Sequence, residues 1–262
     1  MSLFKRLTRL VPMKSLHALL AGILLLQTPM TLAEDITVAV ASNFTQVLRE
    51  LALDFQKASG HRVILASGSS GRLYAQVVNG APYDLFFSAD AEKPAQLVAD
   101  GLADADSLVT YALGTLVLWS ADPDMRVTNG EALNDPRHQR VALANPRLAP
   151  YGAAAAQVLD KLATQGITAG TRITGENITQ AYQYVETGNV PLGFVALSQV
   201  IEDGKIQRGA GWIIPQAMYD AIRQDVVLLN HARDSIAARE FLDFVLSTEG
   251  KNIISKYGYG TD

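Results

Sequence analysis

Residues 36–73 read ITVAVASNFTQVLRELALDFQKASGHRVILASGSSGRL, and this stretch decides the fold. A β-rich run at 36–41 precedes a helical pattern, which Gly60 ends before a second β-rich run at 62–65. The helical pattern places five apolar residues on one face: Val47, Leu48, Leu51, Ala52 and Phe55. Strand, helix and strand in this order predict a parallel βαβ unit with a right-handed crossover.

The alternation of strands and helices continues along the chain. We expect helices at 71–79, 92–100, 152–165, 178–186 and, largely, 234–257, with strands at 84–89, 115–119, 141–144, 192–196 and 225–229. The apolar terminal helices can pack back on the first unit. The pattern predicts a hinged, two-lobed α/β protein, with a discontinuous first lobe (34–113 and 226–262), a second lobe (114–225), and crossings near 112–116 and 223–227.

The first 33 residues have the pattern of a secretory signal peptide. Four basic residues and no acidic one precede the apolar run LHALLAGILLL at 16–26, and the small residues at 31–33 suit cleavage after Ala33. The apolar run is shorter than the roughly 20 residues of a membrane-spanning helix. An uncleaved amphipathic anchor is the alternative. We expect export to the periplasm as a protein that is not embedded in the membrane.

Charge and cysteine content exclude several functions. The chain has 262 residues and a net charge of −4; without the four basic residues of the leader, 18 Lys and Arg face 26 Asp and Glu, which gives −8. An acidic protein binds nucleic acid poorly. The chain has no Cys, so disulfides, thiolate metal sites and a lipid-modified N-terminal cysteine are excluded.

Four predicted strand–helix junctions could hold a ligand, at 41–45, 67–71, 145–152 and 175–178. In open α/β sheets ligands bind where strands end and helices begin, and a helix N-terminus offers unpaired N–H groups and roughly half a positive charge. Four such ends that converge would form an oxyanion cage. The alternatives are ordinary: Ser42 and Asn43 as helix caps, and GSSG at 68–71 as a flexible turn.

Signatures of enzymes are weak. The GSSG loop lacks the Gly-Lys-Ser/Thr of a nucleotide-phosphate loop and the Gly-x-Ser-x-Gly spacing of a nucleophile elbow. His61, His138 and His231 lie outside the four junctions, and Asp84 and Asp90 have no partner base or metal cluster in sequence. The rival from another class is an exported hydrolase with Ser70 as nucleophile, which would need a base within hydrogen-bond reach.

The segments VAVASNFTQVL, ASGSSGRLYAQVVNGAPYDLFFSAD, ALANPRLAPYGAAAAQVL and GENITQAYQYVETGNVPLGFVALSQV, with the ending FLDFVLSTEGKNIISKYGYG, resemble the periplasmic molybdate-binding proteins of ABC importers. The resemblance covers about residues 36–260. It implies the two-lobed type II periplasmic binding protein fold, with two parallel-rich sheets, flanking helices and a hinge. It further implies a non-enzymatic, monomeric receptor without a cofactor, which carries molybdate or tungstate to an inner-membrane ABC permease.

The resemblance also implies the ligand-binding residues. They contact the oxygens of the anion rather than the metal itself, and they are Ser42, Asn43, Ser70 and the backbone N–H groups of Tyr151 and Ile178. Some members have a tyrosine where this chain has Ala196, and Asn43 could replace that lost donor. A fully deprotonated dianion only accepts hydrogen bonds, so neutral donors favour molybdate, tungstate or sulfate over phosphate. Receptors for another oxyanion or a ferric ion, and a periplasmic sensor, stay open as alternatives.

Overall fold

The computed structural model describes residues 33–202 and 204–261, and Glu34–Asp262 form one compact unit. The signal peptide predicted for residues 1–33 lies outside the described residues, except for its last position. Within the described ranges, no helix has the length and apolar character needed to cross a bilayer.

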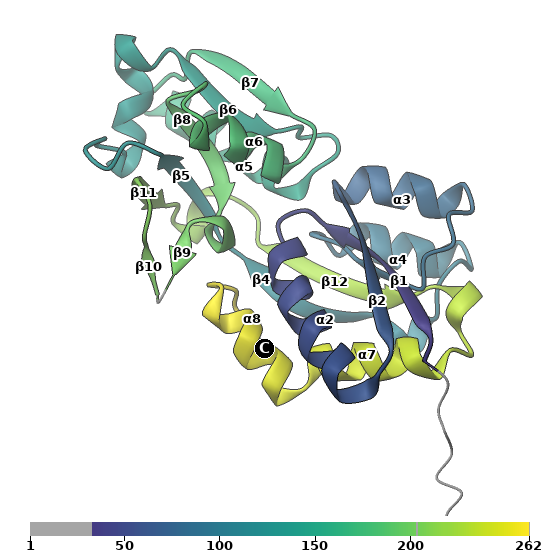
Figure 1. The fold of residues 1–262 in the computed structure, drawn as a ribbon. Coiled ribbons are helices and arrows are strands. Elements are labelled where there is room, and N and C mark those ends of the chain that lie inside the picture. The colour runs from purple at the N-terminus through teal and green to yellow at the C-terminus, as the bar shows by residue number, and fades with distance from the viewer. Residues whose placement is uncertain (1–32, 203, 262) are drawn as a thin grey trace, which may run out of the picture. The chain divides into compact units, whose positions relative to one another are not determined.

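The first sheet has five strands and is mixed. Its order is β2 (Arg62–Gly68), β1 (Asp35–Ala41), β3 (Leu85–Phe87), β12 (Ile222–Leu228) and β4 (Val109–Gly114). The first three strands are parallel, and β12 is antiparallel to both β3 and β4. Its helices are α2 (Thr45–Ser59), α3 (Ser70–Val78), α4 (Glu92–Ala99), α7 (Ile236–Leu246) and α8 (Thr248–Lys256) (Figure 1). The predicted parallel βαβ unit is confirmed.

The second sheet also has five strands, in the order β11 (Ala210–Ile213), β5 (Leu116–Ser120), β8 (Leu192–Ala196), β6 (Arg140–Ala144) and β7 (Thr171–Gly175). β6 is parallel to β7 and β8, whereas β5 is antiparallel to β8 and β11. Its helices are α5 (Pro150–Thr164) and α6 (Ile178–Glu186), and a small hairpin joins β9 (Ile201–Glu202) to β10 (Lys205–Ile206). The ends of α6 and β8 agree with the sequence prediction.

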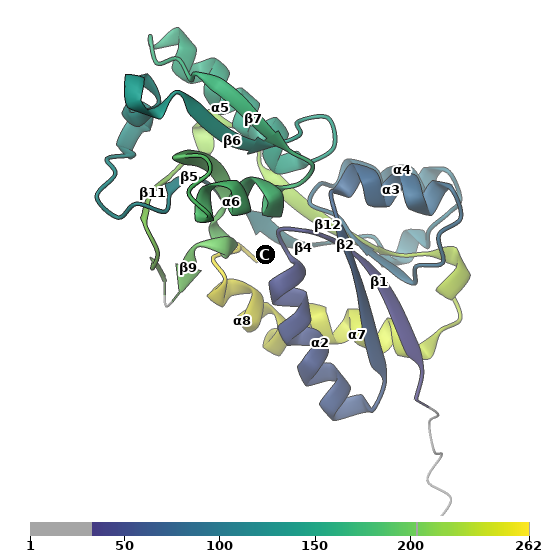
Figure 2. The same cartoon turned by 45° about the horizontal axis from the view of Figure 1, so that its top comes forward.

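The chain passes from the first sheet to the second at the short link between β4 and β5 (Figure 1). It returns between Ile213 and Ile222, because β12 already pairs with β4 at Ile222. The expected second crossing near 223–227 is therefore a few residues too late. Near the end of the chain, Gly260 pairs with Leu113 of β4, so the C-terminus lies close to the connecting strands (Figure 2). The lobe boundaries themselves stay a prediction.

Helices cover both faces of the first sheet, which explains why β1 is continuously apolar and buried from Val38 to Ala41. Val38 and Val40 pack in a cluster with residues of α2, α7 and α8, whereas Ala39 joins a cluster with residues of α3 and α4. All five apolar residues predicted for one face of α2 are buried. Burying each side chain the size of Val or Leu contributes about 1.5–3 kcal/mol, so these clusters hold the strand ends, and the loops that follow them, in place.

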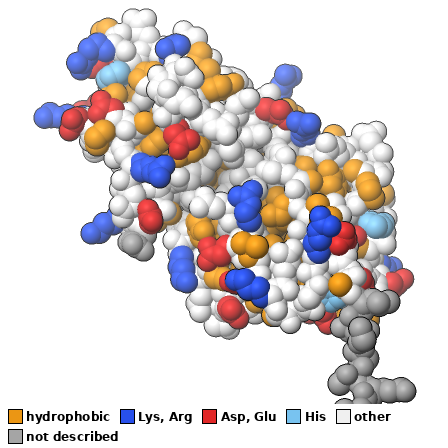
Figure 3. Space-filling view, viewed as in Figure 1, with side chains coloured by type: hydrophobic (Ala, Val, Ile, Leu, Met, Phe, Trp, Pro, Cys, Tyr) orange, Lys and Arg blue, Asp and Glu red, His pale blue; other side chains and the backbone are white. Residues whose placement is uncertain are grey.

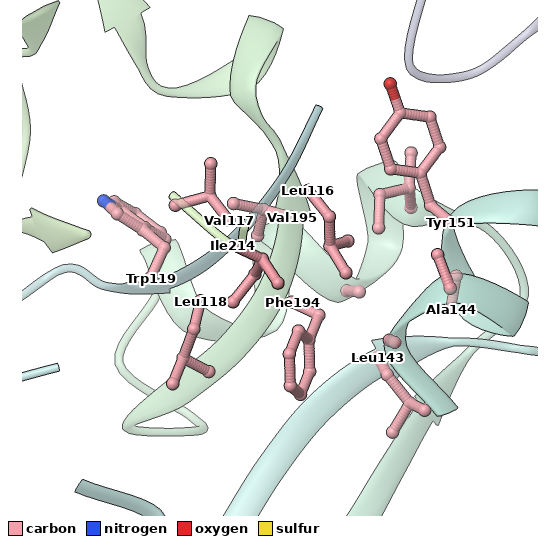
Figure 4. Packing of buried hydrophobic residues seen from close by; sticks show 14 of the residues in the cluster. Leu116, Val117, Leu118, Trp119, Leu143, Ala144, Tyr151, Phe194, Val195 and Ile214 are labelled. Atoms are coloured by element: carbon pink, nitrogen blue, oxygen red, sulfur yellow. The ribbon is translucent and has the colours of Figure 1, made fainter. Parts of the chain in front are cut away.

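The second sheet has its own large core. Trp119 and Phe194 are fully buried there, and α5 and α6 pack against them with Val158 and Ala181. Tyr151 lies at the border of this cluster, with its hydroxyl directed away from the aliphatic side chains (Figure 4). On the surface seen in Figure 3, acidic and basic side chains are interspersed, without a large area of one sign.

Candidate functional site

The four predicted strand–helix junctions converge on one small cavity. It is lined by the loop after β1, the start of α3, the end of the β3 strand region and the starts of α5 and α6. The lining residues are Ala41, Ser42, Asn43, Gly68, Ser69, Ser70, Ala89, Ala149, Pro150, Tyr151 and Ile178. Its volume is about 10 Å³, close to what a single buried water molecule needs. A cavity of this size suits a small inorganic ligand.

Five backbone N–H groups of the cavity have no hydrogen-bond partner among the described residues: those of Asn43, Ser69, Ser70, Tyr151 and Ile178. Three of them belong to the first turns of α3, α5 and α6, where helical N–H groups have no acceptor within the helix. Buried backbone donors are almost always paired. The cavity therefore holds a set of donors that lack only an acceptor.

The loop after β1 does not cap α2, although Ser42 and Asn43 were possible caps from sequence. Phe44 is the N-cap residue, and no side chain accepts a hydrogen bond there. The Ser42 N–H donates to the Gly68 carbonyl (2.9 Å), and its hydroxyl has no partner among the described residues. The capping alternative is wrong for both residues, which leaves the Ser42 hydroxyl and the Asn43 N–H available to a ligand.

Ser70 presents its hydroxyl hydrogen to the cavity. The side chain is 1% exposed, and its Oγ accepts a hydrogen bond from the N–H of Ala89 at 2.9 Å. Because the oxygen is already held as an acceptor, its own hydrogen is free to be donated. Ser70 thus offers both an N–H and an O–H, as an anion requires.

No charged side chain lines the cavity. The positive ends of α3, α5 and α6 face it instead, and helix N-termini stabilise anions without a basic residue. Asn177 caps α6 by accepting from the N–H of Gln180 at 3.0 Å, so the cap leaves the Ile178 N–H uncommitted. The site is electrically neutral but presents donors only.

The side-chain amide of Asn43 donates its hydrogens within the protein and not to the cavity. Its amide nitrogen donates to the Oε1 of Gln224 (2.9 Å) and to the hydroxyl of Tyr259 (3.0 Å). Both amide hydrogens are used, so in this arrangement only the backbone N–H of Asn43 could replace a donor lost at Ala196. Ala196 itself is fully buried at the end of β8 and does not line the cavity.

A buried polar network lies behind the cavity. Gln224, which is 0% exposed on β12, also donates to the Tyr151 hydroxyl (3.3 Å) and accepts from the Tyr111 hydroxyl (3.0 Å). Tyr259 donates to the Asn43 carbonyl at 2.9 Å. The network thus ties the loop after β1 to the start of α5 through a single glutamine. Sequence reasoning missed Gln224 and Tyr259, because neither stands at a strand–helix junction.

The phenols of this network are held neutral. Burial raises the pKa of Tyr259 to about 12 and the pKa of Tyr111 and Tyr151 well above 10.0. Loss of solvation is the main cause in each case, since a phenolate is stabilised by water. The three hydroxyls stay protonated at neutral pH, so no negative phenolate lies beside the cavity.

Further direct contacts join residues of the two sheets around the cavity. The Gly71 N–H donates to the Leu148 carbonyl (2.9 Å), and the Thr179 hydroxyl donates to the Ser42 carbonyl (3.2 Å). At the surface, Arg72 Nη1 lies 2.6 Å from Glu176 Oε1. Arg72 is exposed, as expected, but it is paired rather than free. These contacts hold the junctions together in a closed arrangement.

The geometry gives no support to a hydrolase. No His, Asp or Glu lines the cavity, and the partner of the Ser70 hydroxyl is a backbone N–H rather than a base. Two histidines are engaged elsewhere: His61 accepts from the Glu34 N–H, while His231 lies 2.9 Å from Asp84. Within the described residues no cluster of His, Asp or Glu could hold a metal ion, and a ferric site of that kind is absent there.

The two sheets, the strands that connect them and the donor-lined cavity define an α/β solute-binding protein. A family model described as bacterial extracellular solute-binding protein matches residues 36–260, and the chain belongs to that family. The type II periplasmic binding protein fold expected from the resemblance is confirmed.

The particular relatives are molybdate-binding proteins. The chain is 44% identical over 228 residues to the molybdate-binding protein ModA of Azotobacter vinelandii, covering 87% of this chain and 90% of that protein. It is 45% identical over 230 residues to ModA of Rhodobacter capsulatus, covering 88% and 90%. The solved periplasmic molybdate-binding protein of A. vinelandii superposes with a TM-score of 0.80 at 38% identity, over 87% of this chain and 99% of that one. The resemblance inferred from sequence is confirmed.

Proposed function

We propose that this protein is a non-enzymatic periplasmic receptor that binds molybdate, and also tungstate, in the cavity between the two sheets. The observation that carries the proposal is a set of five unpaired backbone N–H groups around a cavity without a charged lining residue, those of Asn43, Ser69, Ser70, Tyr151 and Ile178. The hydroxyls of Ser42 and Ser70 complete the contacts. The similarity to molybdate-binding relatives supports the same ligand.

The choice of ligand follows from hydrogen-bond chemistry. Molybdate and tungstate carry no proton at neutral pH and only accept hydrogen bonds, whereas hydrogen phosphate also needs an acceptor. No carboxylate lines the cavity to provide one. Sulfate is likewise an acceptor only, so it is the runner-up, and the radius of the closed cavity must separate it from the larger oxyanions.

The receptor would deliver its anion to an inner-membrane ABC permease. Binding would stabilise the closed arrangement, because the donors come from both sheets, and a ligand shifts an equilibrium only as far as it prefers one state. A permease that recognises the closed form would then receive loaded receptor. We further propose that the mature protein begins after Ala33, acts as a monomer without a cofactor, and binds neither nucleic acid nor the membrane interior.

Calorimetric titration of the purified mature protein tests the ligand. Molybdate and tungstate should bind tightly, sulfate much more weakly and phosphate not at all. Binding of sulfate alone, or of none of the four, would refute the molybdate assignment. Sequencing the N-terminus of exported protein tests the cleavage site, and a hydrolytic activity that disappears in Ser70→Ala would favour the enzyme alternative.

A further inference from the structure

Ser69, beside the residue that carries the proposed function, has an unexplained hydroxyl. The side chain is 2% exposed, it lines the cavity, and its Oγ has no hydrogen-bond partner. Among the described residues only one other buried polar side-chain atom lacks a hydrogen-bond partner. It is the Nδ1 of His138, which does not line the cavity. Buried hydroxyls are normally paired, so each exception calls for a reason.

The usual function of a serine at this position does not account for it. Ser69 is the N-cap residue of α3, where a serine hydroxyl commonly accepts from the second or third N–H of the helix. No such bond forms, and the second N–H, that of Gly71, donates instead to the Leu148 carbonyl. The hydroxyl is therefore withheld from capping while it remains buried at the cavity wall.

We propose that the Ser69 hydroxyl is a direct ligand of the bound oxyanion and donates its hydrogen to one of the oxygens. This inference rests on the proposed function, and it adds a binding residue to that site. With Ser42 and Ser70 it gives three hydroxyl donors beside the five backbone N–H groups. An oxyanion oxygen can accept two hydrogen bonds, so four oxygens accommodate all of these donors.

A dianion also explains the lack of another partner. If the Ser69 hydroxyl also accepted a hydrogen bond from an N–H group of α3, that N–H group would no longer be available to the anion. Because no acceptor among the described residues binds the Ser69 hydroxyl hydrogen, that hydrogen can be donated to an oxygen of the anion. A hydrogen bond to a charged acceptor is roughly twice as strong as one between neutral groups, which offsets the cost of burying the unpaired hydroxyl.

The test is molybdate titration of Ser69→Ala beside the wild type. Loss of one hydrogen bond to a charged group should weaken binding by about 10- to 100-fold. Thermal unfolding of the ligand-free variant should occur at the same temperature as in the wild type or higher, because the mutation removes an unsatisfied buried group. Ser69→Gly, which also lacks the hydroxyl, should show the same loss of affinity and serves if the alanine variant fails to fold.

Ser67→Ala is the matched control. This serine is exposed on β2, and its hydroxyl lies 2.7 Å from that of Thr45, outside the cavity. Its affinity for molybdate should not change. Wild-type affinity in Ser69→Ala would overturn the inference, as would a loss of affinity matched by a fall in the unfolding temperature of the ligand-free form. If the wild type itself does not bind molybdate, the proposed function fails instead.

Discussion

Gly71→Ala should separate closure of the site from stability of the fold. Gly71 lies in the first turn of α3, and its N–H donates to the Leu148 carbonyl, which belongs to the loop before α5. A Cβ at this position would lie 3.1 Å from both the Cα and the carbonyl oxygen of Leu148. The atoms in contact are backbone, so no side-chain rotation can relieve the crowding, and the loop must move by a few tenths of an ångström.

The magnitude follows from where the crowding acts. Overpacking of this kind costs about 1–3 kcal/mol, and the cost falls only on the closed arrangement, because the crowded atoms come from the two different sheets. Binding requires closure, so affinity for molybdate should fall about 5- to 150-fold. Replacing a helical Gly by Ala restricts the unfolded chain and stabilises the ligand-free protein by about 0.4–1 kcal/mol. The two effects have opposite signs.

Calorimetric titration gives the affinity, and thermal unfolding without ligand gives the stability. Val78→Ala is the control: Val78 is exposed near the end of the same helix, and alanine is the better helix former. The control should gain stability slightly and bind molybdate as the wild type does. If Gly71→Ala bound as tightly as the wild type, the closed arrangement described above would not be the form that holds the ligand.

Three further outcomes are expected. Arg72→Ala removes the exposed ion pair with Glu176, so affinity should fall only a few-fold, because solvent and salt screen exposed pairs, and titration in high salt should abolish the difference. Gln224→Met keeps the volume but leaves the Asn43 amide and the Tyr151 hydroxyl short of a partner, so stability should fall by about 1–3 kcal/mol in denaturant unfolding, and molybdate affinity should fall with it; a variant as stable as the wild type would refute the importance of the network. Burial raises the pKa of Tyr259 to about 12 from an ordinary 10.0, so the unfolded chain loses this proton first. The contribution of Tyr259 to stability should be full below pH 10 and fall between pH 10 and 12, by about 1.4 kcal/mol per pH unit. Tyr111 and Tyr151 have raised pKa values as well, so Tyr259→Phe should reduce the loss of stability with pH without abolishing it.

Local patterns predicted most of the elements. The apolar face of α2 and the ends of α6 follow from the 3.6-residue periodicity, and β8 follows from the continuous apolar run LGFVA; both signals depend only on neighbouring residues. β4 and β7 were not predicted as strands, because VTYALG and TRITG are short and each mixes buried with exposed positions. Their pairing comes from the sheets they join, which local sequence does not describe.

The sequence predicted which loops form the site, but not how these loops come together. Each junction was visible as a strand end followed by polar residues and a helix start, but their convergence depends on the packing of two sheets. The network behind the cavity was invisible for the same reason: Asn43 and Tyr259 are bonded across 216 positions of sequence. Ser69 and Ser70 look alike in the GSSG loop, and only burial and hydrogen bonding distinguish them.

The position of β12 has a consequence for the order in which the protein folds. This strand lies between β3 and β4 in the middle of the first sheet, yet it begins only at Ile222. Domains fold as units while the chain is synthesised from its N-terminus. Here β3 can pair with β1 early, but it lacks its other neighbour, β12, until most of the chain has been made. The nascent protein therefore cannot complete its first sheet before translation is almost over. The cavity at the ends of the strands therefore takes shape only after β12 has joined the sheet.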